Sequence, residues 1–339
     1  MRQVLADTDG IKVLQTQRPT PKEGEVLVRS TLVGICGSDT HALVGMHSFL
    51  KPPYVPGHEA VGTVAELGPG VEGIEVGSRV LIKPNLDCGT CENCRAGRDN
   101  ACDTLNWIGC DPKGEHPGAM ADYVLAPAKN LYELPGWVSD EEGVLVECLA
   151  TPVHAVRIAG DVEGSRVLVI GVGTIGLLTV LAARRAGAGS IAVIDLEQSK
   201  LDRALAQGAD AAILAASAGV EEQVRKALGG PADVVFDCVA NEATVRQSFE
   251  LVRKAGSVIV VGVPAGPFTV EVGLLQDREL RLQGSAAYAA KDVETALLIA
   301  SESGIPAKGI VTAIYEMEDA PKAFAEASQN VSGKVMVRC

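Results

Sequence analysis

Short apolar runs of strand length, separated by Gly, Pro and Asp, dominate the first part of the chain. Runs at 26–35, 60–67, 78–83 and 121–126 are rich in Val, Leu and Ile and end in turn-forming residues, the pattern of β-strands. Helical periodicity is scarce over the same stretch. The pattern predicts an irregular all-β domain over residues 1–150.

The rhythm changes at about residue 165, where strand-like and helix-like segments begin to alternate. Apolar runs at 166–171, 190–195, 210–214, 233–239 and 257–262 alternate with amphipathic segments at 174–187, 197–208, 221–230 and 241–256. This alternation predicts an α/β fold with a doubly wound parallel sheet and right-handed crossovers over residues 151–285. The apolar stretch 257–264 would be an exposed template for pairing if it lay at a sheet edge.

The last stretch, residues 286–339, carries no sign of a third domain. It offers two helices, at about 292–303 and 319–329, and a closing strand at 333–338. We expect this segment to return to the first domain and to pack on the other two.

Composition narrows the class of protein. The 339 residues are 47% hydrophobic and 22% charged, as in ordinary globular domains. A net charge of −13 would repel a phosphate backbone, so nucleic acid is not an expected partner. The longest uncharged apolar run, 167–183, contains three glycines, and the N-terminus lacks the apolar core of a signal peptide. We therefore expect a cytoplasmic protein with no membrane partner and with reduced cysteines.

A glycine-rich turn follows the first strand of the alternating region. Gly171, Gly173 and Gly176 form GxGxxG between an apolar run and a helical pattern, the context in which a helix N-terminus binds a pyrophosphate. Asp195 ends the next strand, at the position of the acid that binds the adenosine ribose diol. A carboxylate there repels a 2′-phosphate, and Leu196 rather than Arg follows it, so we predict NAD over NADP. Further cofactor contacts are expected from Thr174, Ile175, Val239, Val261 and Gly262.

Four cysteines gather in one short segment at about 85–105. Cys88, Cys91, Cys94 and Cys102 read C-x2-C-x2-C-x7-C among Gly, Asn and Asp. Four thiolates on one loop make a closed tetrahedral shell, which points to a structural zinc ion. An iron–sulfur cluster is the main rival, although the wide last gap does not match the ferredoxin pattern; unrelated buried thiols are the remaining alternative.

The other cysteines carry less chemistry. Cys110, Cys238 and Cys339 have no metal partner at a recognisable spacing, so we interpret them as buried or terminal thiols.

A second group of metal-type residues lies at the ends of two predicted strands. Cys36, Ser38 and His41 follow the first, and His58 and Glu59 precede the second. Together with the GxGxxG turn and the four-cysteine lobe, this pattern resembles the zinc-dependent medium-chain alcohol and polyol dehydrogenases. The resemblance extends from residue 25 to residue 334.

The resemblance implies a fold and a zinc site. A chaperonin-10-like (GroES-like) β domain would surround an inserted Rossmann domain, with the active site in the cleft between them. Cys36 and His58 match the family's catalytic zinc ligands, and Glu59 matches an acid that binds the metal or exchanges with water. Glu147, 24 residues before Gly171, matches a further acid of the polyol and threonine branches. Its neighbour Cys148 is a softer, competing ligand.

The resemblance also implies a reaction. Zinc would act as a Lewis acid on a secondary alcohol while NAD accepts the hydride. Ser38 and His41 match a relay that hands the released proton through the cofactor ribose to solvent. Each subunit would hold one catalytic and one structural zinc ion, and the subunits would form a homotetramer, or else a dimer.

The substrate class follows from Glu147 and from the motif CGSDTH at 36–41, which is closer to sorbitol-type enzymes than to ethanol enzymes. We predict oxidation of a polyol, a sugar alcohol or a cyclitol to a ketone. Ala287 stands where the sorbitol branch carries an Arg, which argues against sorbitol itself. Alternatives are L-threonine 3-dehydrogenase and a simple secondary-alcohol dehydrogenase. More remote are a zinc-free quinone reductase and a non-catalytic NAD-binding protein.

Overall fold

The computed structural model describes residues 1–47, 49–329 and 333–339, and the chain divides into two units. The β unit comprises Met1–Glu147 and Ala289–Cys339, and the α/β unit comprises Cys148–Tyr288. The first crossing falls inside one continuous helix, α3 (Asp140–Ala159). Each border between the units lies three residues from the border expected from the sequence, at 150 and at 285. A border inside an unbroken helix is not marked by a change of composition.

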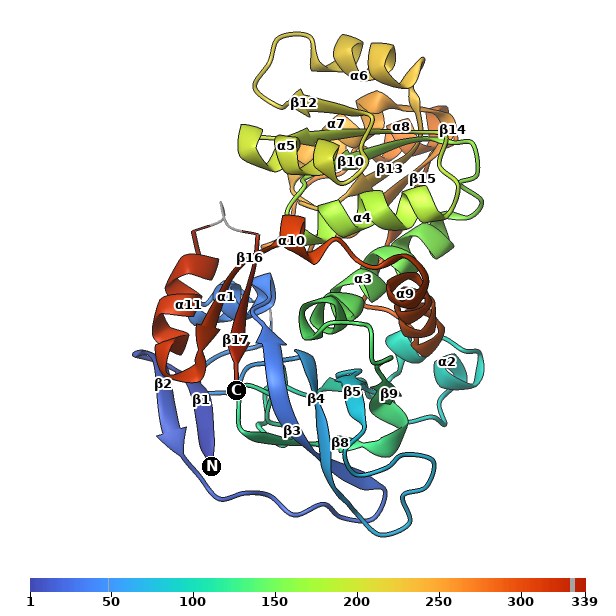
Figure 1. Ribbon diagram of the computed structural model, residues 1–339. Helices are drawn as coiled ribbons and strands as arrows, with labels where there is room; N and C mark the ends of the chain where they lie inside the picture. The colour runs from blue at the N-terminus through green and yellow to red at the C-terminus, as the bar shows by residue number, and fades with distance from the viewer. Residues whose placement is uncertain (48, 330–332) are drawn as a thin grey trace. The chain divides into compact units, whose positions relative to one another are not determined.

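The β unit is organised around one seven-stranded sheet in the order β16-β17-β3-β4-β5-β9, with β8 also paired to β3 (Figure 1). The strands are β3 (Glu25–Gly34), β4 (Glu59–Leu67), β5 (Arg79–Ile82), β8 (Tyr123–Pro127), β9 (Leu131–Glu133), β16 (Val311–Glu316) and β17 (Lys334–Arg338). The C-terminal strand β17 pairs antiparallel with β3, so the two ends of the sequence share one sheet.

Smaller elements complete the β unit. They are β1 (Arg2–Asp7), β2 (Gly10–Gln15), β6 (Asn85–Leu86), β7 (Asn106–Trp107), α1 (Gly37–Leu43), α2 (Glu92–Arg95), α9 (Ala290–Ser303), α10 (Ala307–Ile310) and α11 (Ala320–Ala327). Apolar side chains of the strands and Phe324 of α11 form its core. Short 3-10 turns occur at Asp99–Ala101, Ala128–Asn130 and Met317–Asp319. In the part of the chain that the structure describes, no helix is both long and apolar enough to cross a bilayer.

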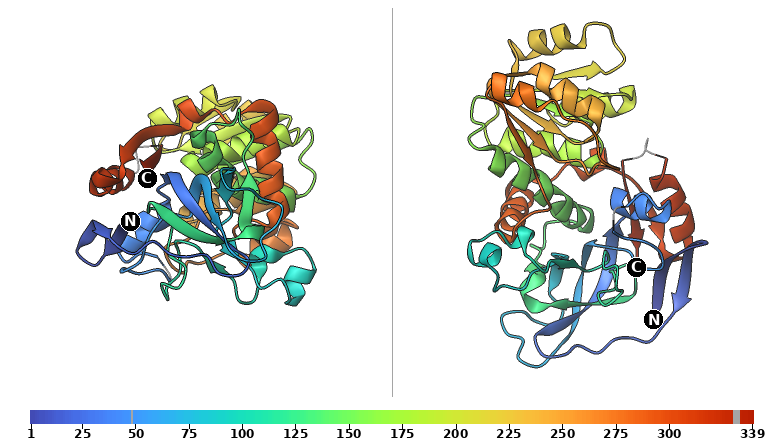
Figure 2. Two further views of the ribbon diagram at one scale, coloured as in Figure 1. Left: turned by 60° about the horizontal axis from the view of Figure 1, so that its bottom comes forward. Right: turned by 180° about the vertical axis from the view of Figure 1, so that it is seen from behind.

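The α/β unit is a six-stranded parallel sheet in the order β12-β11-β10-β13-β14-β15. The strands are β10 (Arg166–Ile170), β11 (Ser190–Asp195), β12 (Ala211–Leu214), β13 (Ala232–Asp237), β14 (Val252–Val260) and β15 (Arg281–Gly284). The helices are α4 (Thr174–Arg185), α5 (Gln198–Ala206), α6 (Val220–Leu228), α7 (Glu242–Leu251) and α8 (Val272–Asp277). Helices α6 and α7 cover one face of the sheet and α4 and α5 cover the other (Figures 1 and 2). The predicted α/β class with a doubly wound parallel sheet is confirmed.

One predicted helix is too long. The segment 241–256 was expected to be helical, but α7 ends at Leu251 and β14 begins at the next residue. The guanidinium group of Arg278 donates hydrogen bonds to the carbonyl oxygens of Phe249 and Val252 and so satisfies the end of the helix. Ala255 then adopts a φ of 55°, which places an irregularity in the strand. A side chain 27 residues away decides this boundary.

The apolar stretch 257–264 was expected to be an exposed template for pairing only if it lay at a sheet edge, and its strand does not lie there. Strand β14 lies between β13 and β15, so residues 257–260 are paired on both sides, and the edge strands of this sheet are β12 and β15. The order of strands in a parallel sheet depends on crossovers that apolar patterning does not specify.

Two glycines near the start of α4 have opposite surroundings. A Cβ added to Gly176 would lie 1.9 Å from the carbonyl oxygen of Gly171, whereas one added to Gly173 would meet nothing within 4 Å. Gly171 itself has a φ of 83°, a conformation that favours glycine. The first turn of α4 therefore depends on the absence of a side chain at position 176.

We expect Gly176→Ala to destabilise the protein by at least about 2 kcal/mol, because a backbone carbonyl must move to admit the methyl group. Gly173→Ala is the matched control and should change the free energy of unfolding by less than about 0.5 kcal/mol. Denaturant unfolding followed by circular dichroism measures both. Equal stabilities of the two variants would contradict this account of the turn.

Candidate active site and metal centres

The register of two antiparallel strands brings together residues that are more than twenty positions apart in the sequence. Gly34, the last residue of β3, pairs with Glu59, the first residue of β4. Cys36 follows the end of β3 and His58 precedes the start of β4, so both lie at the same end of the strand pair. Strand pairing, rather than loop conformation, therefore places the two side chains side by side.

Four sequence-predicted residues lie here in two groups that share Glu59, and Cys148 belongs to the second group. The ligand atoms of Cys36, His58 and Glu59 lie within 4.8 Å of one another, and the carboxylates of Glu59 and Glu147 are equally close. His58, Glu59 and Glu147 are buried. A thiol, an imidazole and carboxylates are the donors that zinc accepts in proteins. Cys148, the expected competitor of Glu147, is the next residue of α3 and is also buried.

The electrostatic surroundings of His58 favour a positive charge. Burial by itself lowers the pKa of His58, but Cys110, Asp39 and Cys36 together raise that pKa well above its ordinary value. Burial also raises the pKa of Asp39, which accepts a hydrogen bond from the hydroxyl of Tyr54. A site that favours a protonated imidazole also favours a cation bound to a neutral one, so these residues fit a metal ion.

Lys334 balances the charge of Glu59. Its ammonium group lies 2.6 and 2.7 Å from the two carboxylate oxygens and also donates to the carbonyl oxygen of Ile35 at 3.2 Å. Both side chains are at most 5% exposed, so the ion pair has little screening by water. A Cβ at Gly34 would lie 2.0 Å from the Glu59 carboxylate, which passes over the bare glycine backbone.

Helix α1 carries the two expected relay residues. It begins after Cys36, whose backbone N–H donates to Asp39 at 3.2 Å. Ser38 presents a buried hydroxyl oxygen with no hydrogen-bond partner among the described residues. His41 is exposed. The hydroxyl of Ser38 therefore makes no hydrogen bond to His41 in the described part of the chain, and their relay stays a prediction.

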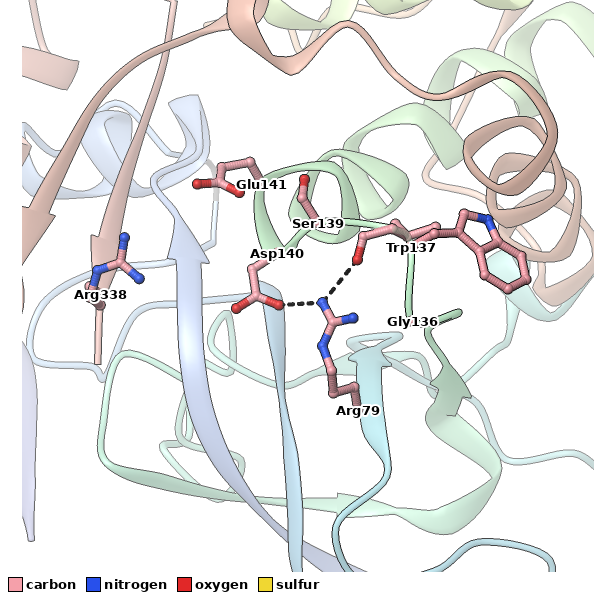
Figure 3. A pocket seen from close by; sticks show the side chains of 8 residues that line it. Arg79, Gly136, Trp137, Ser139, Asp140, Glu141 and Arg338 are labelled. Carbon is pink, nitrogen blue, oxygen red and sulfur yellow. Dashed lines mark hydrogen bonds and ion pairs between the residues drawn. The ribbon is translucent and has the colours of Figure 1, made fainter.

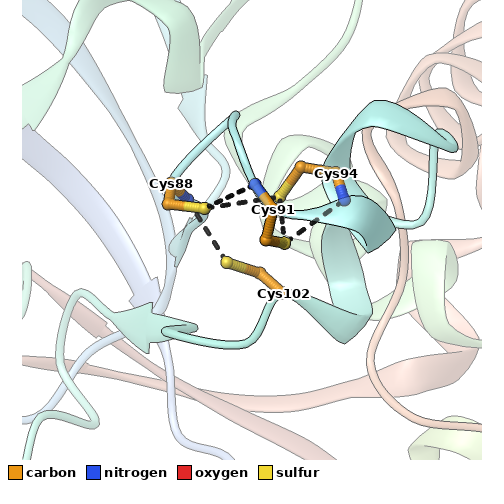
Figure 4. A group of neighbouring side chains, drawn as sticks. All are labelled: Cys88, Cys91, Cys94 and Cys102. Carbon is orange, nitrogen blue, oxygen red and sulfur yellow. Dashed lines mark hydrogen bonds between the residues drawn. The ribbon is translucent and has the colours of Figure 1, made fainter.

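The four lobe cysteines converge (Figure 4). The sulfurs of Cys91 and Cys94 are 3.4 Å apart and those of Cys88 and Cys94 are 4.0 Å apart. Hydrogen bonds from Thr90 and from the Cys91 backbone lower the pKa of Cys88 to about 5, whereas burial and the neighbouring thiols raise the pKa of Cys94 to about 12. Four thiols this close can all ionise only beside a cation, so the cluster fits a metal ion such as zinc.

A buried lysine ties this lobe to the rest of the β unit. Lys83, 4% exposed at its side chain, lies 2.6 Å from Asp99 and 3.6 Å from Asp87. Asp99 also accepts the backbone N–H of Ala290, the first residue of α9. The lobe is therefore anchored at both ends to the fold.

The expected dinucleotide residues meet at the ends of β10, β11, β13 and β14. A Cβ at Gly171 would lie 2.4 Å from the Val239 side chain, and one at Gly262 would lie 2.7 Å from the Val239 backbone. Asp195 accepts the N–H of Val172 at 2.8 Å and that of Glu197 at 3.0 Å. The carboxylate thus holds the glycine-rich turn in place in addition to its expected contact with a ribose.

The same unit shows where the remaining cofactor residues lie. Thr174 and Ile175 open α4, with Gly173 as its N-cap. Val261 follows β14, and its N–H donates to the carbonyl oxygen of Asp237 at 2.8 Å. The N-terminus of a twelve-residue helix and the adjoining loops thus form one cluster, the arrangement that binds a pyrophosphate.

A surface pocket of about 520 Å³ lies at the start of α3 (Figure 3). Arg79 and Arg338 line it, but Arg79 donates to Asp140 and to the carbonyl oxygen of Val138, and Arg338 pairs with Glu316. The described residues that line it include neither Cys nor His. This pocket therefore lacks the donors of the metal centres.

Sequence reasoning missed three residues beside the candidate catalytic centre: Asp39, Cys110 and Lys334. Asp39 lay inside the CGSDTH motif, and its position on the same helix as Ser38 was a usable signal. Lys334 is the first residue of the closing strand β17, a position at which a charged side chain gives little indication of burial. Cys110 carried no signal, because its partner is 52 residues away.

Comparisons with known proteins agree along the whole chain. An alcohol dehydrogenase GroES-like domain matches residues 22–136, and a zinc-binding dehydrogenase domain matches residues 174–302. Sorbitol dehydrogenase of Ovis aries is 33% identical over 95% of this chain and 91% of its own length. D-xylulose reductase A of Aspergillus niger is 31% identical over 94% and 92%.

A solved structure gives the same result for the fold. It is a protein from Sinorhizobium meliloti 1021 that was assigned as a zinc-binding dehydrogenase and is bound to NADP. Its TM-score is 0.91 at 32% identity, over 100% of this chain and 99% of that one. The predicted combination of a GroES-like domain with a doubly wound sheet is thereby confirmed.

We expect Lys334→Met to destabilise the protein by about 3–5 kcal/mol, because it leaves the buried Glu59 carboxylate without its cation. Lys322→Met, which removes an exposed ion pair with Asp319, is the control and should cost at most about 1 kcal/mol. Adding Glu59→Gln to Lys334→Met should restore part of the loss. The free energy of unfolding in denaturant measures all three, and a mild Lys334→Met variant would refute the ion pair's role.

Proposed function

The chain belongs to the zinc-dependent medium-chain dehydrogenases, in their polyol branch, and on this premise we propose that it oxidises a secondary alcohol with NAD. The substrate class is a polyol, a sugar alcohol or a cyclitol, and the product is a ketone. The observation that carries the proposal is the cluster of Cys36, His58 and Glu59 at the end of the β3–β4 pair, with Glu147 beside Glu59. A structural protein has no need for such a donor set.

Cys36, His58 and Glu147 would hold the catalytic zinc ion. Glu59 is the less favoured ligand, because both of its oxygens lie within hydrogen-bond distance of Lys334. When bound, zinc supplies a Lewis acid that makes an alcohol hydroxyl easier to deprotonate. Glu59 remains close enough to exchange with a ligand position, and Lys334 limits how far it can move.

Cys88, Cys91, Cys94 and Cys102 would hold a second, structural zinc ion. Their closed arrangement leaves no open coordination position for a substrate. Asp99 of this lobe pairs with Lys83 and also accepts the N–H of Ala290, so the lobe is connected to the start of α9. We therefore assign stability rather than chemistry to this site.

The glycine-rich turn and α4 would bind the nicotinamide cofactor, which accepts the hydride. The first N–H groups of α4 would donate to the pyrophosphate, and the open space at the bare backbone of Gly173 would allow its close approach. Asp195 ends β11 beside an exposed Leu196. A carboxylate in this position favours a ribose hydroxyl over a phosphate, so NAD is the proposed cofactor, although the solved relative binds NADP.

Two residues of helix α1 would release the proton. The buried hydroxyl of Ser38 has no partner among the described side chains and is available to a substrate hydroxyl. His41 lies one turn further on the same helix and is exposed to solvent. These two residues would take the proton from the buried site to bulk water.

Three further predictions accompany this assignment. Position 287 is Ala in this chain, whereas the sorbitol branch carries an Arg there, so we predict a substrate other than sorbitol. A homotetramer, or else a dimer, and a cytoplasmic location also stay predictions. None of these affects the assignment of the reaction.

The reaction is tested with the purified protein and a panel of polyols, cyclitols, amino-cyclitols, threonine and simple secondary alcohols. We expect NADH formation with at least one polyol or cyclitol, and a kcat/KM with NADP at least about tenfold lower, a difference of about 1.4 kcal/mol. Removal of the metal by a chelator should abolish turnover, and added zinc should restore it. Absorbance at the NADH band measures each rate.

Gly173→Ala is the structural control for this assay. Since its methyl group would fill the space left for the pyrophosphate, it should weaken NAD binding while leaving the fold intact. Turnover that survives complete zinc removal would overturn the metal mechanism. Turnover of threonine alone would move the protein to the alternative branch.

The ligand assignment is tested by three variants. We expect Glu147→Gln to lower the zinc content from two ions to nearly one per subunit, because it removes a proposed ligand charge, whereas Cys148→Ser should keep both. Glu59→Gln should keep most of its zinc. Metal analysis by mass spectrometry measures the content. Loss of zinc from Cys148→Ser but not from Glu147→Gln would assign the sulfur as the ligand.

A further inference from the structure

One imidazole nitrogen of His58, Nδ1, lies beside two residues that are not proposed zinc ligands, Cys110 and Asp39. Its Nδ1 atom lies 3.3 Å from the sulfur of Cys110 and 3.9 Å from the nearer carboxylate oxygen of Asp39. His58 and Cys110 are each at most 6% exposed, and Asp39 is fully buried. Water therefore has little access to this nitrogen, and its partner must come from the protein.

The thiol, not the carboxylate, is within hydrogen-bond distance. A sulfur contact of 3.3 Å is short for this weak acceptor, whereas 3.9 Å is beyond the limit for a nitrogen and an oxygen. The carboxylate of Asp39 is already used by the N–H of Cys36 at 3.2 Å and by the hydroxyl of Tyr54 at 3.3 Å. Asp39 thus organises the start of α1 and contributes charge, but not the nearest contact, to His58.

The backbone fixes the sulfur in this place. Gly109 has a φ of 81°, and a Cβ there would lie 2.7 Å from the carbonyl oxygen of Gly57. The backbone before Cys110 therefore packs directly against the backbone before His58. The N–H of Gly109 also donates to the carbonyl oxygen of His116 at 3.0 Å. Main-chain packing thus fixes Gly109 and Gly57, the residues that directly precede Cys110 and His58.

We infer that Cys110 is a positioning residue whose sulfur accepts the Nδ1–H of His58 and thereby leaves Nε2 free to bind zinc. The inference rests on the proposed function. A neutral imidazole carries one proton, so a partner that keeps it on Nδ1 selects the tautomer with a lone pair on Nε2. A thiol is a weaker hydrogen-bond acceptor than a carboxylate. The imidazole of His58 would therefore keep nearly the charge of a neutral ligand and would lower the Lewis acidity of the metal only slightly.

The test compares variants that separate hydrogen bonding from volume. Cys110→Ser keeps an acceptor, and Cys110→Ala removes it. Cys339→Ala is the matched control, because Cys339 is a partly buried thiol of the same unit whose sulfur donates to the carbonyl oxygen of Ala119 at 3.7 Å. Each protein is loaded with zinc, and metal transfer to a chromophoric chelator is timed. The Cys36→Ser variant identifies the phase that belongs to the catalytic site.

We expect Cys110→Ala to lose the catalytic zinc about tenfold faster than the unmodified protein, the size of effect that follows loss of a hydrogen-bond partner behind a metal-binding histidine. Cys110→Ser and Cys339→Ala should stay within about twofold of it, and the lobe phase should be the same in all four. After Co²⁺ replaces zinc at the catalytic site, the visible absorption bands should shift in Cys110→Ala and be largely restored in Cys110→Ser.

The outcomes decide between three explanations. An unchanged rate and spectrum in Cys110→Ala would show that Asp39 alone orients His58 and would overturn the inference. Equal losses in the Ser and Ala variants would assign the effect to packing and would also overturn it. A chain that holds no zinc at Cys36 and His58 would instead refute the proposed function. If Cys110→Ala does not fold, Cys110→Val, which keeps the volume and removes the acceptor, makes the same comparison with Cys110→Ser.

Discussion

The pairing of β3 with β4 is the constraint on which the candidate active site depends. It places Gly34 opposite Glu59 and so sets Cys36 and His58 at one end of the strand pair. The same pairing buries the Glu59 carboxylate, a group that is costly to remove from water without a partner. The third strand of this set, β17, supplies Lys334 as that partner. The placement of Cys36, His58 and Glu59 and the buried ion pair are therefore consequences of one sheet.

In the β unit, two buried lysines each neutralise a carboxylate. Lys334 neutralises a carboxylate beside the proposed catalytic metal, and Lys83 neutralises Asp99 at the base of the cysteine lobe. In each case the lysine belongs to the sheet or its immediate extension, while the carboxylate belongs to the metal-binding segment. A charge pair of this kind contributes less to overall stability than to the exact placement of its partners, because desolvation offsets much of the attraction. Rigid placement is what a metal site requires.

The division of labour between the two units follows from their backbones. The parallel sheet of the α/β unit gathers strand ends and a helix N-terminus, where N–H groups without partners suit a phosphate. The antiparallel sheet of the β unit brings side chains from distant strands into register, which suits a cluster of metal donors. Asp195 has a structural role besides its predicted contact with the cofactor, because it accepts the N–H of Val172 within the glycine-rich turn.

Local patterns determined much of this molecule. The GxGxxG turn, the four clustered cysteines and the alternation of strands and helices are properties of short segments, so the fold class and the donors of the cysteine lobe could be predicted without coordinates. The donors of the candidate catalytic site, Cys36, His58, Glu59 and Glu147, were predicted from the family resemblance. Tertiary structure alone decided the end of α7, through Arg278, the interior position of β14, and the contacts of Glu59 with Lys334 and of His58 with Cys110. The physical reason is the same in each case: these contacts join residues far apart in the sequence, and their energies depend on burial and register that exist only after the chain has folded.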